Sequence, residues 1–484
     1  MLGFDHLRTL RLGGETWSTP ASLRLAGRPE ALLFAADRSG RVSAFSLDRT
    51  EPVWTFEAGE EITASPCIAH SKGQGPLLLI GDHGGRLHAL HALTGETVWS
   101  TRCGSAIRCT VALALVEGVP AIFLGSYGPW LCRLDLEGQF VWRRRLPKHE
   151  YVSRTKKGIV SSPLVADIDG DGRLEIVTGS RSSRLYAADA LTGRLKWFRE
   201  LAYDSDASPS FATIDGIGHV FVGGGEHTSG QGDNALIALR GSDGGELWRA
   251  PLNGAIDSCA ILASPNSKGN ADPADALAYA TTLAMPSVVA VRACDGSEAW
   301  RHTFGPTAGC DHASGQCVPK ETGVYFTEHA VCRSYTVPLI ADLDGDGRDE
   351  VLAGSNNGEV VMLDAETGEK RACDRVEGMV RGSPILADLD GCGTSELVVC
   401  NGDRLEILRT AHAGAPWTGL KGEPTHQGRL GLANPAPEPG PRQSWLWPKL
   451  VWSWLVVDSA RFALFHFERR IARWFGIRFR RYYY

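Results

Sequence analysis

A tryptophan recurs about every 45 to 55 residues along this chain, each time at the end of the same eleven-residue phrase. The clearest copy runs from Ala187 to Trp197 and reads Ala-Ala-Asp-Ala-Leu-Thr-Gly-Arg-Leu-Lys-Trp. Looser copies end at Trp54 and at Ala372. In five copies a glycine stands four residues before the tryptophan: Gly95 and Trp99, Gly138 and Trp142, Gly193 and Trp197, Gly244 and Trp248, and Gly296 and Trp300. A repeat of this length indicates one supersecondary unit that is copied in a stack or around an axis.

Each copy contains short runs of β-branched and small residues separated by glycine turns. Residues 77–81, for example, are followed by a turn, by the alternating run 86–90 and by a third run that reaches the tryptophan. This order predicts three or four short strands in each copy. Four-stranded sheets repeated around an axis form a β-propeller, so we expect an all-β fold in which each tryptophan is wedged between neighbouring blades.

The number of repeats predicts eight blades, with seven as the alternative. The first run, from His6 to Trp17 with Gly13 four residues before the tryptophan, has the form of an outer strand. Its partner strands are expected around residues 384–410, so that the two ends of the chain complete one blade together. The predicted propeller spans residues 1–430 as a single domain, and the 56 Gly and 25 Pro of the chain suit its many turns.

The phrase Ala-x-Asp-x-x-Thr-Gly-x-x-x-Trp resembles the repeat of quinoprotein-type propellers, and the resemblance covers residues 6–430. This fold is shared by pyrroloquinoline-quinone (PQQ) alcohol dehydrogenases and by the non-enzymatic outer-membrane assembly lipoprotein. Because one fold hosts unrelated activities, the resemblance implies the fold and leaves the function to be argued from particular sites.

Two acidic loops, residues 167–175 and 342–350, are near-copies of each other and carry the main candidate metal sites. They read Asp-Ile-Asp-Gly-Asp-Gly-Arg-Leu-Glu and Asp-Leu-Asp-Gly-Asp-Gly-Arg-Asp-Glu. Alternate carboxylates on a glycine-tightened loop converge on one point, which suits the oxygen-rich shell of Ca²⁺. The predicted ligands are Asp167, Asp169, Asp171, the Arg173 carbonyl and Glu175 in the first loop, and Asp342, Asp344, Asp346, the Arg348 carbonyl and Glu350 in the second.

A third copy, residues 388–396, has lost one carboxylate. Cys392 places a soft sulfur where Ca²⁺ needs a hard oxygen, and Asp388, Asp390 and Glu396 remain as candidate ligands, so we expect weak Ca²⁺ binding or none. The two intact loops resemble those of FG-GAP repeats. A structural role is expected for all three loops because nothing beside them resembles a nucleophile or a base. The alternative for the intact loops is an acidic turn that binds no ion.

The interval between Trp300 and Ala372 is the longest of the series and contains an insertion, residues 304–334. Its candidate metal ligands are Cys310, His312, Cys317, His329 and Cys332. These side chains are of the type that holds Zn²⁺, although their spacing matches no zinc-finger pattern. A disulfide such as Cys310 to Cys317 and a plain loop are the alternatives. Insertions on a propeller commonly determine specificity, so this segment is also the first candidate for a binding surface.

Signatures of catalysis are missing from the sequence. It contains no His-Glu-x-x-His, no Gly-x-Ser-x-Gly and no Walker loop. The resemblance implies that a PQQ dehydrogenase would carry a vicinal disulfide against its cofactor, whereas none of the 12 Cys here is followed directly by another. We therefore expect neither PQQ nor catalysis. The alternative is a quinone-dependent or other enzyme that uses the central funnel of the propeller.

The C-terminal region differs in composition from the propeller. A Pro-rich linker, residues 431–443, precedes a basic aromatic tail, residues 444–484. Residues 442–484 hold nine Lys and Arg against two acidic residues, while the whole chain has a formal charge of −6. Apolar residues such as Phe467 and Ile471 share one stripe, which predicts an amphipathic helix. We expect this helix to bind an anionic membrane surface or to dock on a protein, without spanning a bilayer or binding nucleic acid.

The N-terminus, Met1 to Arg8, lacks the apolar stretch of a signal peptide. This predicts a cytoplasmic or peripheral membrane protein with mostly reduced cysteines. Loops of the FG-GAP type suit extracellular Ca²⁺ instead, and a misplaced start site would put the protein outside the cytoplasm. The sequence as a whole predicts a non-catalytic, calcium-stabilised β-propeller that presents a binding surface to a protein or glycan, with its C-terminal helix at a membrane surface or a partner.

Overall fold

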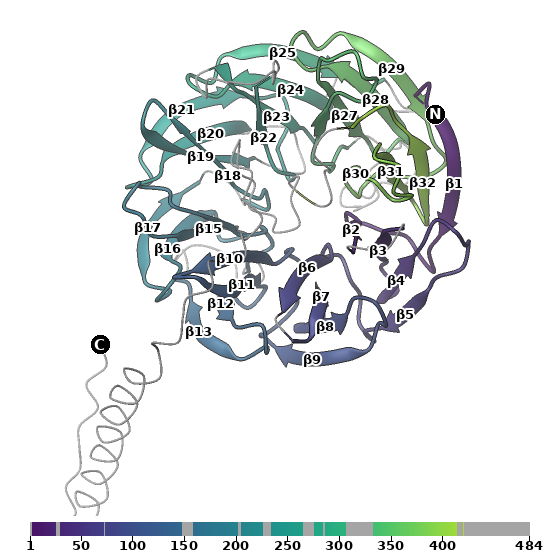
Figure 1. The fold of residues 1–484 in the computed structure, drawn as a ribbon. Helices are drawn as coiled ribbons and strands as arrows, with labels where there is room; N and C mark the ends of the chain where they lie inside the picture. Colours follow the sequence, from purple (N-terminus) through teal and green to yellow (C-terminus); the bar gives the residue numbers. More distant parts are fainter. Residues whose placement is uncertain are drawn as a thin grey trace, which may run out of the picture. The chain divides into compact units, whose positions relative to one another are not determined.

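Eight four-stranded antiparallel sheets surround a central axis and form the blades of a propeller (Figure 1). The computed structural model describes residues 2–25, 30–71, 73–147, 158–201, 205–225, 234–264, 275–283, 286–305, 333–413 and 420. The predicted all-β, eight-bladed fold is therefore confirmed. Within these residues no helix is long and apolar enough to cross a membrane. The helix predicted for residues 444–484 lies outside the described part of the chain.

The strands of blades 1 to 7 follow one another in sequence from the axis to the rim. Blade 1 has β2 (Ala21–Leu23), β3 (Leu32–Ala36), β4 (Arg41–Phe45) and β5 (Trp54–Glu57); blade 2 has β6 (Cys67–Ser71), β7 (Gly75–Gly81), β8 (Arg86–His91) and β9 (Thr97–Arg102); blade 3 has β10 (Ala112–Val116), β11 (Val119–Ser126), β12 (Trp130–Leu134) and β13 (Phe140–Arg145). Blade 4 has β14 (Leu164–Ala166), β15 (Glu175–Ser180), β16 (Arg184–Asp189) and β17 (Leu195–Glu200); blade 5 has β18 (Ser210–Ile214), β19 (Ile217–Gly224), β20 (Ala235–Arg240) and β21 (Glu246–Pro251). Blade 6 has β22 (Ile261–Ala263), β23 (Leu277–Thr281), β24 (Ser287–Arg292) and β25 (Glu298–Thr303); blade 7 has β26 (Leu339–Ala341), β27 (Glu350–Gly354), β28 (Glu359–Asp364) and β29 (Lys370–Arg375).

Blade 8 is built from both ends of the chain. Its inner strands are β30 (Ile385–Ala387), β31 (Glu396–Asn401) and β32 (Arg404–Arg409), and β1 (Asp5–Arg11) pairs with β32 as the outer strand. The Thr9 hydroxyl donates to Glu406 at 2.6 Å across this pair. The prediction that both termini complete one blade is confirmed, and pairing of this kind leaves the ring without an open seam between its first and last residues.

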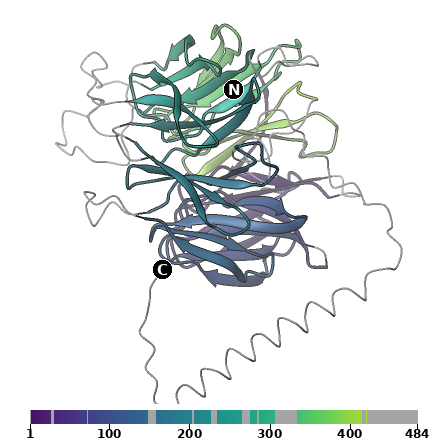
Figure 2. The same cartoon turned by 90° about the vertical axis from the view of Figure 1, so that its left-hand side faces the viewer.

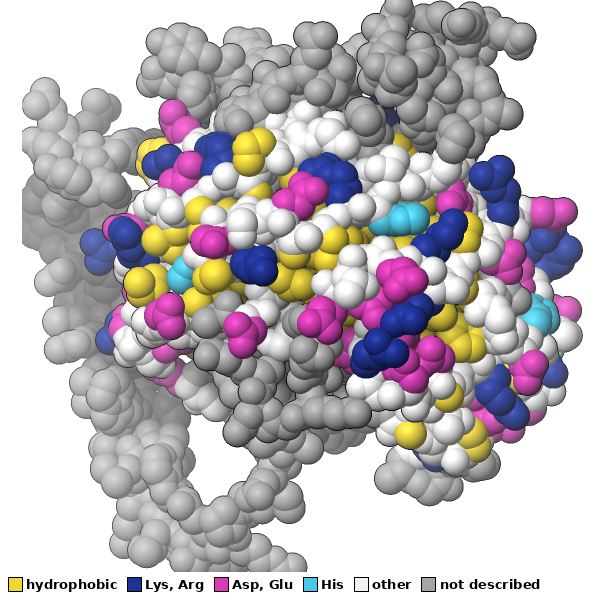
Figure 3. Space-filling view, turned by 90° about the horizontal axis from the view of Figure 1, so that it is seen from above, with side chains coloured by type: hydrophobic (Ala, Val, Ile, Leu, Met, Phe, Trp, Pro, Cys, Tyr) yellow, Lys and Arg dark blue, Asp and Glu magenta, His cyan; other side chains and the backbone are white. Residues whose placement is uncertain are grey.

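The hydrophobic core is divided among the interfaces between blades. Eight clusters of buried apolar side chains are found in the described residues, and each draws its members from two neighbouring blades. Both faces of an inner strand are consequently covered, and every residue of β15 is buried. Figure 2 turns the molecule so that blades 4 and 5 face the viewer, and shows the sheets side by side around the axis. Figure 3 shows one side of the molecule, on which acidic and basic side chains are interspersed.

The repeated tryptophans join the blades from blade 1 to blade 7, each to the next. The ring of Trp142 in β13, for example, lies against Gly193 in the turn between β16 and β17, and its Nε1 donates to the Ala190 carbonyl at 3.2 Å. A Cβ on Gly193 would lie 2.7 Å from that ring, and the residue has a φ of +68°, so both space and backbone conformation require glycine. We call this arrangement a tryptophan lock. The six locks pair Trp54 with Gly95, Trp99 with Gly138, Trp142 with Gly193, Trp197 with Gly244, Trp248 with Gly296, and Trp300 with Gly368.

Blades 7, 8 and 1 meet through a different contact. Blade 7 carries Ala372 where blades 1 to 6 carry the lock tryptophan. The Arg381 guanidinium, in the segment before β30, lies 3.9 Å from the Trp17 ring and 4.9 Å from the Tyr335 ring, which belong to the segments before β2 and β26. The prediction that Trp17 ends an outer strand is wrong, because β1 ends at Arg11 and the chain then turns inward. Cation–π stacking on Trp17 thus links blades 8 and 1, which no tryptophan lock joins.

Hydroxyl side chains join neighbouring blades beside the innermost strands, except around blade 6. In six of the eight blades, the residue two positions before the first strand donates its N–H to a hydroxyl at the same position of the next blade, whereas blades 6 and 7 have Cys259 and Val337 there and offer no hydroxyl. The donor and acceptor pairs are Thr19 to Ser65 at 2.9 Å, Ser65 to Thr110 at 3.2 Å, Thr110 to Ser162 at 3.0 Å, Ser162 to Ser208 at 2.9 Å, Val337 to Ser383 at 2.8 Å and Ser383 to Thr19 at 3.1 Å. These bonds satisfy backbone N–H groups that no neighbouring strand reaches, and they fix the spacing of the blades around the axis.

Candidate metal centre

The three acidic loops occupy one structural position in three blades. Residues 167–175, 342–350 and 388–396 each connect the first strand of a blade to its second, in blades 4, 7 and 8. The final glutamate of each loop is the first residue of the second strand and is fully buried or nearly so. Two glycines in every loop have positive φ, for example +82° at Gly345 and +88° at Gly347, and these conformations turn the chain sharply enough to gather the acids.

Hydrogen bonds from the backbone fold each loop around its own carboxylates. In the blade 7 loop, Asp342 accepts the N–H groups of Gly345 at 2.7 Å and Gly347 at 2.9 Å. Glu350 reaches back to accept the N–H of Leu343 at 2.8 Å. The other two loops repeat the same bonds from Asp167 and Glu175, and from Asp388 and Glu396. This shared pattern is a property of the sequence motif, since it recurs in three blades.

Carboxylates converge in both intact loops. One ligand atom from each of Asp167, Asp169 and Glu175 lies within 4.8 Å of the other two. The same holds for Asp342, Asp344 and Glu350. Asp171 and Asp346 do not belong to these groups, and each accepts the N–H of the arginine two residues further on, at 2.8 Å.

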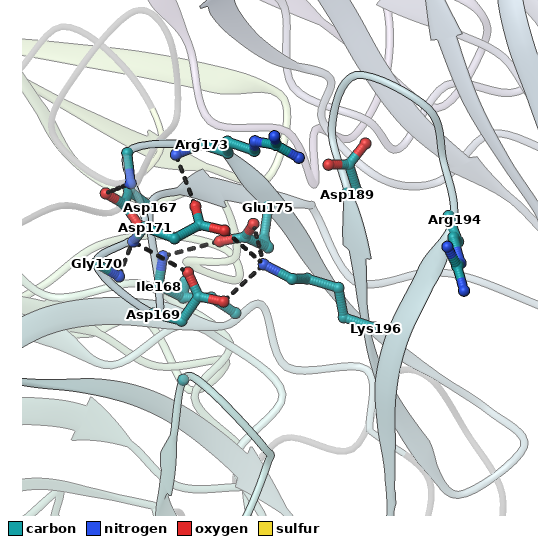
Figure 4. Close-up of polar contacts among 12 residues, drawn as sticks. Asp167, Ile168, Asp169, Gly170, Asp171, Arg173, Glu175, Asp189, Arg194 and Lys196 are labelled. Carbon is teal, nitrogen blue, oxygen red and sulfur yellow. Dashed lines mark hydrogen bonds and ion pairs between the residues drawn. The ribbon is translucent and has the colours of Figure 1, made fainter.

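In the blade 4 loop a lysine already occupies the centre of the acidic group. Lys196 in β17 places its Nζ 2.6 Å from Asp169, 2.7 Å from Glu175 and 3.5 Å from Asp171, as Figure 4 shows. Burial opposes the charged form of this lysine, but hydrogen bonds to Asp169 and Glu175 raise its pKa above the usual value. The ammonium therefore offsets part of the negative charge of the loop from within the protein.

The blade 7 loop has the same acids without this cation. Arg371 stands where blade 4 has Lys196, one residue before Ala372. It pairs instead with Asp364 at 2.6 Å. No Lys or Arg in the described part of the chain forms an ion pair with Asp342, Asp344 or Glu350. Burial, reinforced by the charge of neighbouring Asp344, raises the pKa of Glu350 to about 7. Three converging carboxylates that no cation among the described residues pairs with form the type of oxygen-rich centre that Ca²⁺ takes.

The damaged loop of blade 8 is neutralised by arginines. Arg24 pairs with Asp388, and Arg409 pairs with Asp390 at 2.9 Å. Asp388, Asp390 and Cys392 lie close enough together to share an ion, but the Cys392 thiol faces the Thr394 hydroxyl at 2.9 Å. Two guanidinium groups and a sulfur leave this loop a poor Ca²⁺ site on chemical grounds.

Comparison with known proteins places this propeller in a family. The family model described as outer membrane protein assembly factor BamB matches residues 38–211 and 213–391. The chain belongs to the BamB family. A search of curated proteins finds no match to the sequence.

Solved structures share the fold of this BamB-family chain at low sequence identity. BamB from Moraxella catarrhalis aligns with a TM-score of 0.54 and 17% identity, over 84% of this chain and 99% of its own. Sqt1 from Saccharomyces cerevisiae gives a TM-score of 0.57 and 13% identity, and the computationally designed Ika8 protein gives 0.53 and 12%, with the same coverage. Agreement with a natural BamB, a yeast protein and a designed protein alike shows the propeller fold alone.

Several predicted site residues lie outside the described part of this BamB-family chain. They are the candidate zinc ligands Cys310, His312, Cys317, His329 and Cys332, in the predicted insertion 304–334, of which only residues 304, 305, 333 and 334 are described. Sequence reasoning also missed Lys196, although the signal is present in the phrase itself. A lysine directly before the lock tryptophan lies on the strand that runs past the acidic loop of its own blade.

Proposed function

We propose that this BamB-family propeller is a non-catalytic platform that binds a protein or a glycan. The observation that carries the proposal is the BamB family match over residues 38–211 and 213–391, on a ring that six tryptophan locks hold rigid. A rigid ring presents its connecting loops in fixed positions, and fixed loops bind partners with little loss of conformational entropy.

Calcium is proposed to stabilise this platform through the blade 7 loop. Asp342, Asp344 and Glu350 supply the converging carboxylates, with Asp346 and the Arg348 carbonyl as the remaining candidate ligands. Binding there would offset the burial, and the smaller repulsion by Asp344, that raise the pKa of Glu350. In the blade 4 loop Lys196 already provides a positive charge, so the two loops that look alike in sequence are proposed to differ in their need for an ion.

The platform role predicts a partner of fixed stoichiometry. The full chain, cross-linked in cells and purified under denaturing conditions, is expected to carry one protein or glycan partner attached through the connecting loops. The absorbance spectrum of the purified chain is also expected to show only the ultraviolet bands of its aromatic residues and no cofactor band. A quinone absorbance band that disappears on substrate addition, with no cross-linked partner, would instead establish the enzyme alternative.

The C-terminal tail is proposed to bring the platform to an anionic membrane surface. Residues 444–484 combine excess Arg with Trp and Phe, which suits a helix lying in the headgroup region. The full chain should sediment with anionic liposomes and remain in solution with neutral ones, while a version that ends at residue 433 should sediment with neither. Sedimentation of both versions, or of neither, contradicts the membrane role, and the second result makes the tail a protein-docking segment.

A further inference from the structure

Two short hairpins place apolar side chains in solvent on either side of the blade 4 loop. The turn between β10 and β11 has positive φ at Glu117 (+53°) and Gly118 (+77°), and the turn between β18 and β19 repeats this at Asp215 (+49°) and Gly216 (+74°). Such two-residue turns let antiparallel strands run to the tip of a hairpin. In blades 3 and 5 these tight tips stand where blade 4 has its acidic loop.

The hairpin tips are unusually exposed for apolar residues. Leu115 is 58% exposed and Val119 is 56% exposed, the two highest values among large hydrophobic side chains in the described residues. Ile217 on the blade 5 hairpin is 43% exposed, and Leu191 in the turn between β16 and β17 is 39% exposed. Side chains of this kind in neighbouring elements mark a binding surface more often than a single exposed leucine does.

Contacts between the blades make these elements one surface. Arg133 of blade 3 donates to the Leu191 carbonyl at 3.2 Å. Within blade 4, the N–H of Ala190 donates to the Leu174 carbonyl at 2.8 Å, which joins the turn to the acidic loop, and Figure 4 shows Asp189, where this turn begins, on the side of that loop, with Arg194 farther away. On the other side, Gly218 packs against the carbonyl of Ile168, so the blade 5 hairpin also touches the loop.

This surface is acidic. We define the blade 3–5 face as residues 115–119, 135–139, 167–175, 189–194, 214–217 and 240–245, together with Arg133, Arg144 and Lys196, which reach into it. It contains ten Asp and Glu against six Lys and Arg. The excess of four negative charges lies between hairpin tips that expose Leu115, Val119 and Ile217.

We propose that the blade 3–5 face docks a basic amphipathic segment of a partner protein. The apolar stripe of such a segment would cover the hairpin tips, and its Lys and Arg would meet the acids between them. Charge complementarity favours a basic segment, since the excess negative charge of the face would repel an acidic segment or an anionic lipid surface. The inference deepens the proposed platform role and rests on it, because it assigns that role a face and a class of partner.

A peptide probe tests the face directly. A fluorescein-labelled helical peptide of leucine and lysine, added to the full chain, should bind in a saturable manner. The double variant Leu115→Ser with Val119→Ser should weaken this binding about tenfold. The matched control, Val53→Ser with Val98→Ser, changes two apolar side chains of 38% and 37% exposure on blades 1 and 2, and should bind as the unaltered chain does. Raising the salt concentration from about 50 mM to about 300 mM should weaken binding, because charge attraction contributes.

Equal affinity of the hairpin variant and the control variant would overturn the proposal, as would the absence of binding by the unaltered chain. Thermal unfolding of both variants checks that they fold, which is expected because the altered side chains are exposed. Cross-linking in cells shows whether a failure concerns only the blade 3–5 face or the platform role as a whole. A hairpin variant that keeps its cross-linked partner would show that the platform binds through another face, whereas an unaltered chain without any partner would contradict the platform role.

Discussion

Replacing Trp142 by alanine should lower the free energy of unfolding by about 3 to 5 kcal/mol, the range found for buried aromatic residues. The Trp142 side chain is 7% exposed, packs in the cluster between blades 3 and 4 and donates a hydrogen bond to Ala190. Its removal leaves a cavity in a ring that must stay closed, and it also leaves the Ala190 carbonyl with one donor fewer. Urea unfolding of the full chain, followed by far-ultraviolet circular dichroism, measures the change.

A neighbouring residue provides the control for this substitution. Val141 precedes Trp142 on the same strand but is 52% exposed, so Val141→Ala should change stability by no more than about 0.5 kcal/mol. Gly193→Ala disrupts the same lock from blade 4, because its new methyl group would clash with the Trp142 ring. In the double variant with Trp142→Ala that ring is absent, so the loss in free energy of unfolding should be smaller than the sum of the two single losses. Full additivity would contradict the lock, as would a loss at Trp142 no larger than at Val141.

Periodicity along the chain predicted the repeating framework of the propeller. The recurring phrase predicted short strands in each copy, eight blades and the closing of blade 8 by both termini, because strand pairing within a blade depends on residues close together in sequence. The phrase also gave the glycine and tryptophan of each lock. The phrase did not show that the glycine and the tryptophan of one copy belong to two different locks. Gly193 packs against Trp142 of the preceding blade, while Trp197 of the same copy packs against Gly244 of the next blade.

Contacts between distant segments could not be predicted in this way. Trp17 matched the spacing of a lock residue but stacks on Arg381, which is far away in sequence and adjacent only because the ring closes. Arg24 pairs with Asp388 for the same reason. The acidic loops show the limit most clearly, since two nearly identical motifs receive different neighbours. Lys196 and Arg371 occupy equivalent positions, yet one enters its acidic loop and the other turns to Asp364.

The difference between those two loops predicts that Lys196→Met will destabilise the protein in a chelating buffer and that Ca²⁺ will reverse the loss. Glu175, whose side chain is fully buried, would lose the cation that opposes the effect of burial on its pKa. Breaking a fully buried ion pair costs about 3 to 5 kcal/mol. Because the Lys196 side chain is 28% exposed and water screens part of the interaction, we expect about 2 to 3 kcal/mol. With the ammonium gone, Asp167, Asp169 and Glu175 become free to hold Ca²⁺ as their blade 7 counterparts are proposed to do.

Calorimetric titration with Ca²⁺ at about pH 8, above the pKa of Glu350, distinguishes the two loops. The unaltered chain should bind one ion, Lys196→Met should bind two, and Asp344→Asn should bind none. Free Ca²⁺ at about 100 times its dissociation constant should restore about 2.7 kcal/mol to the Lys196 variant. Arg371→Met is the matched control, because Arg371 lies outside the acidic group and its removal opens no site.

Two outcomes would contradict this prediction. Two ions bound by the unaltered chain would show that Ca²⁺ displaces the Lys196 ammonium from the blade 4 loop. No ion bound by any variant would show that these loops are folded by their own hydrogen bonds and need no metal.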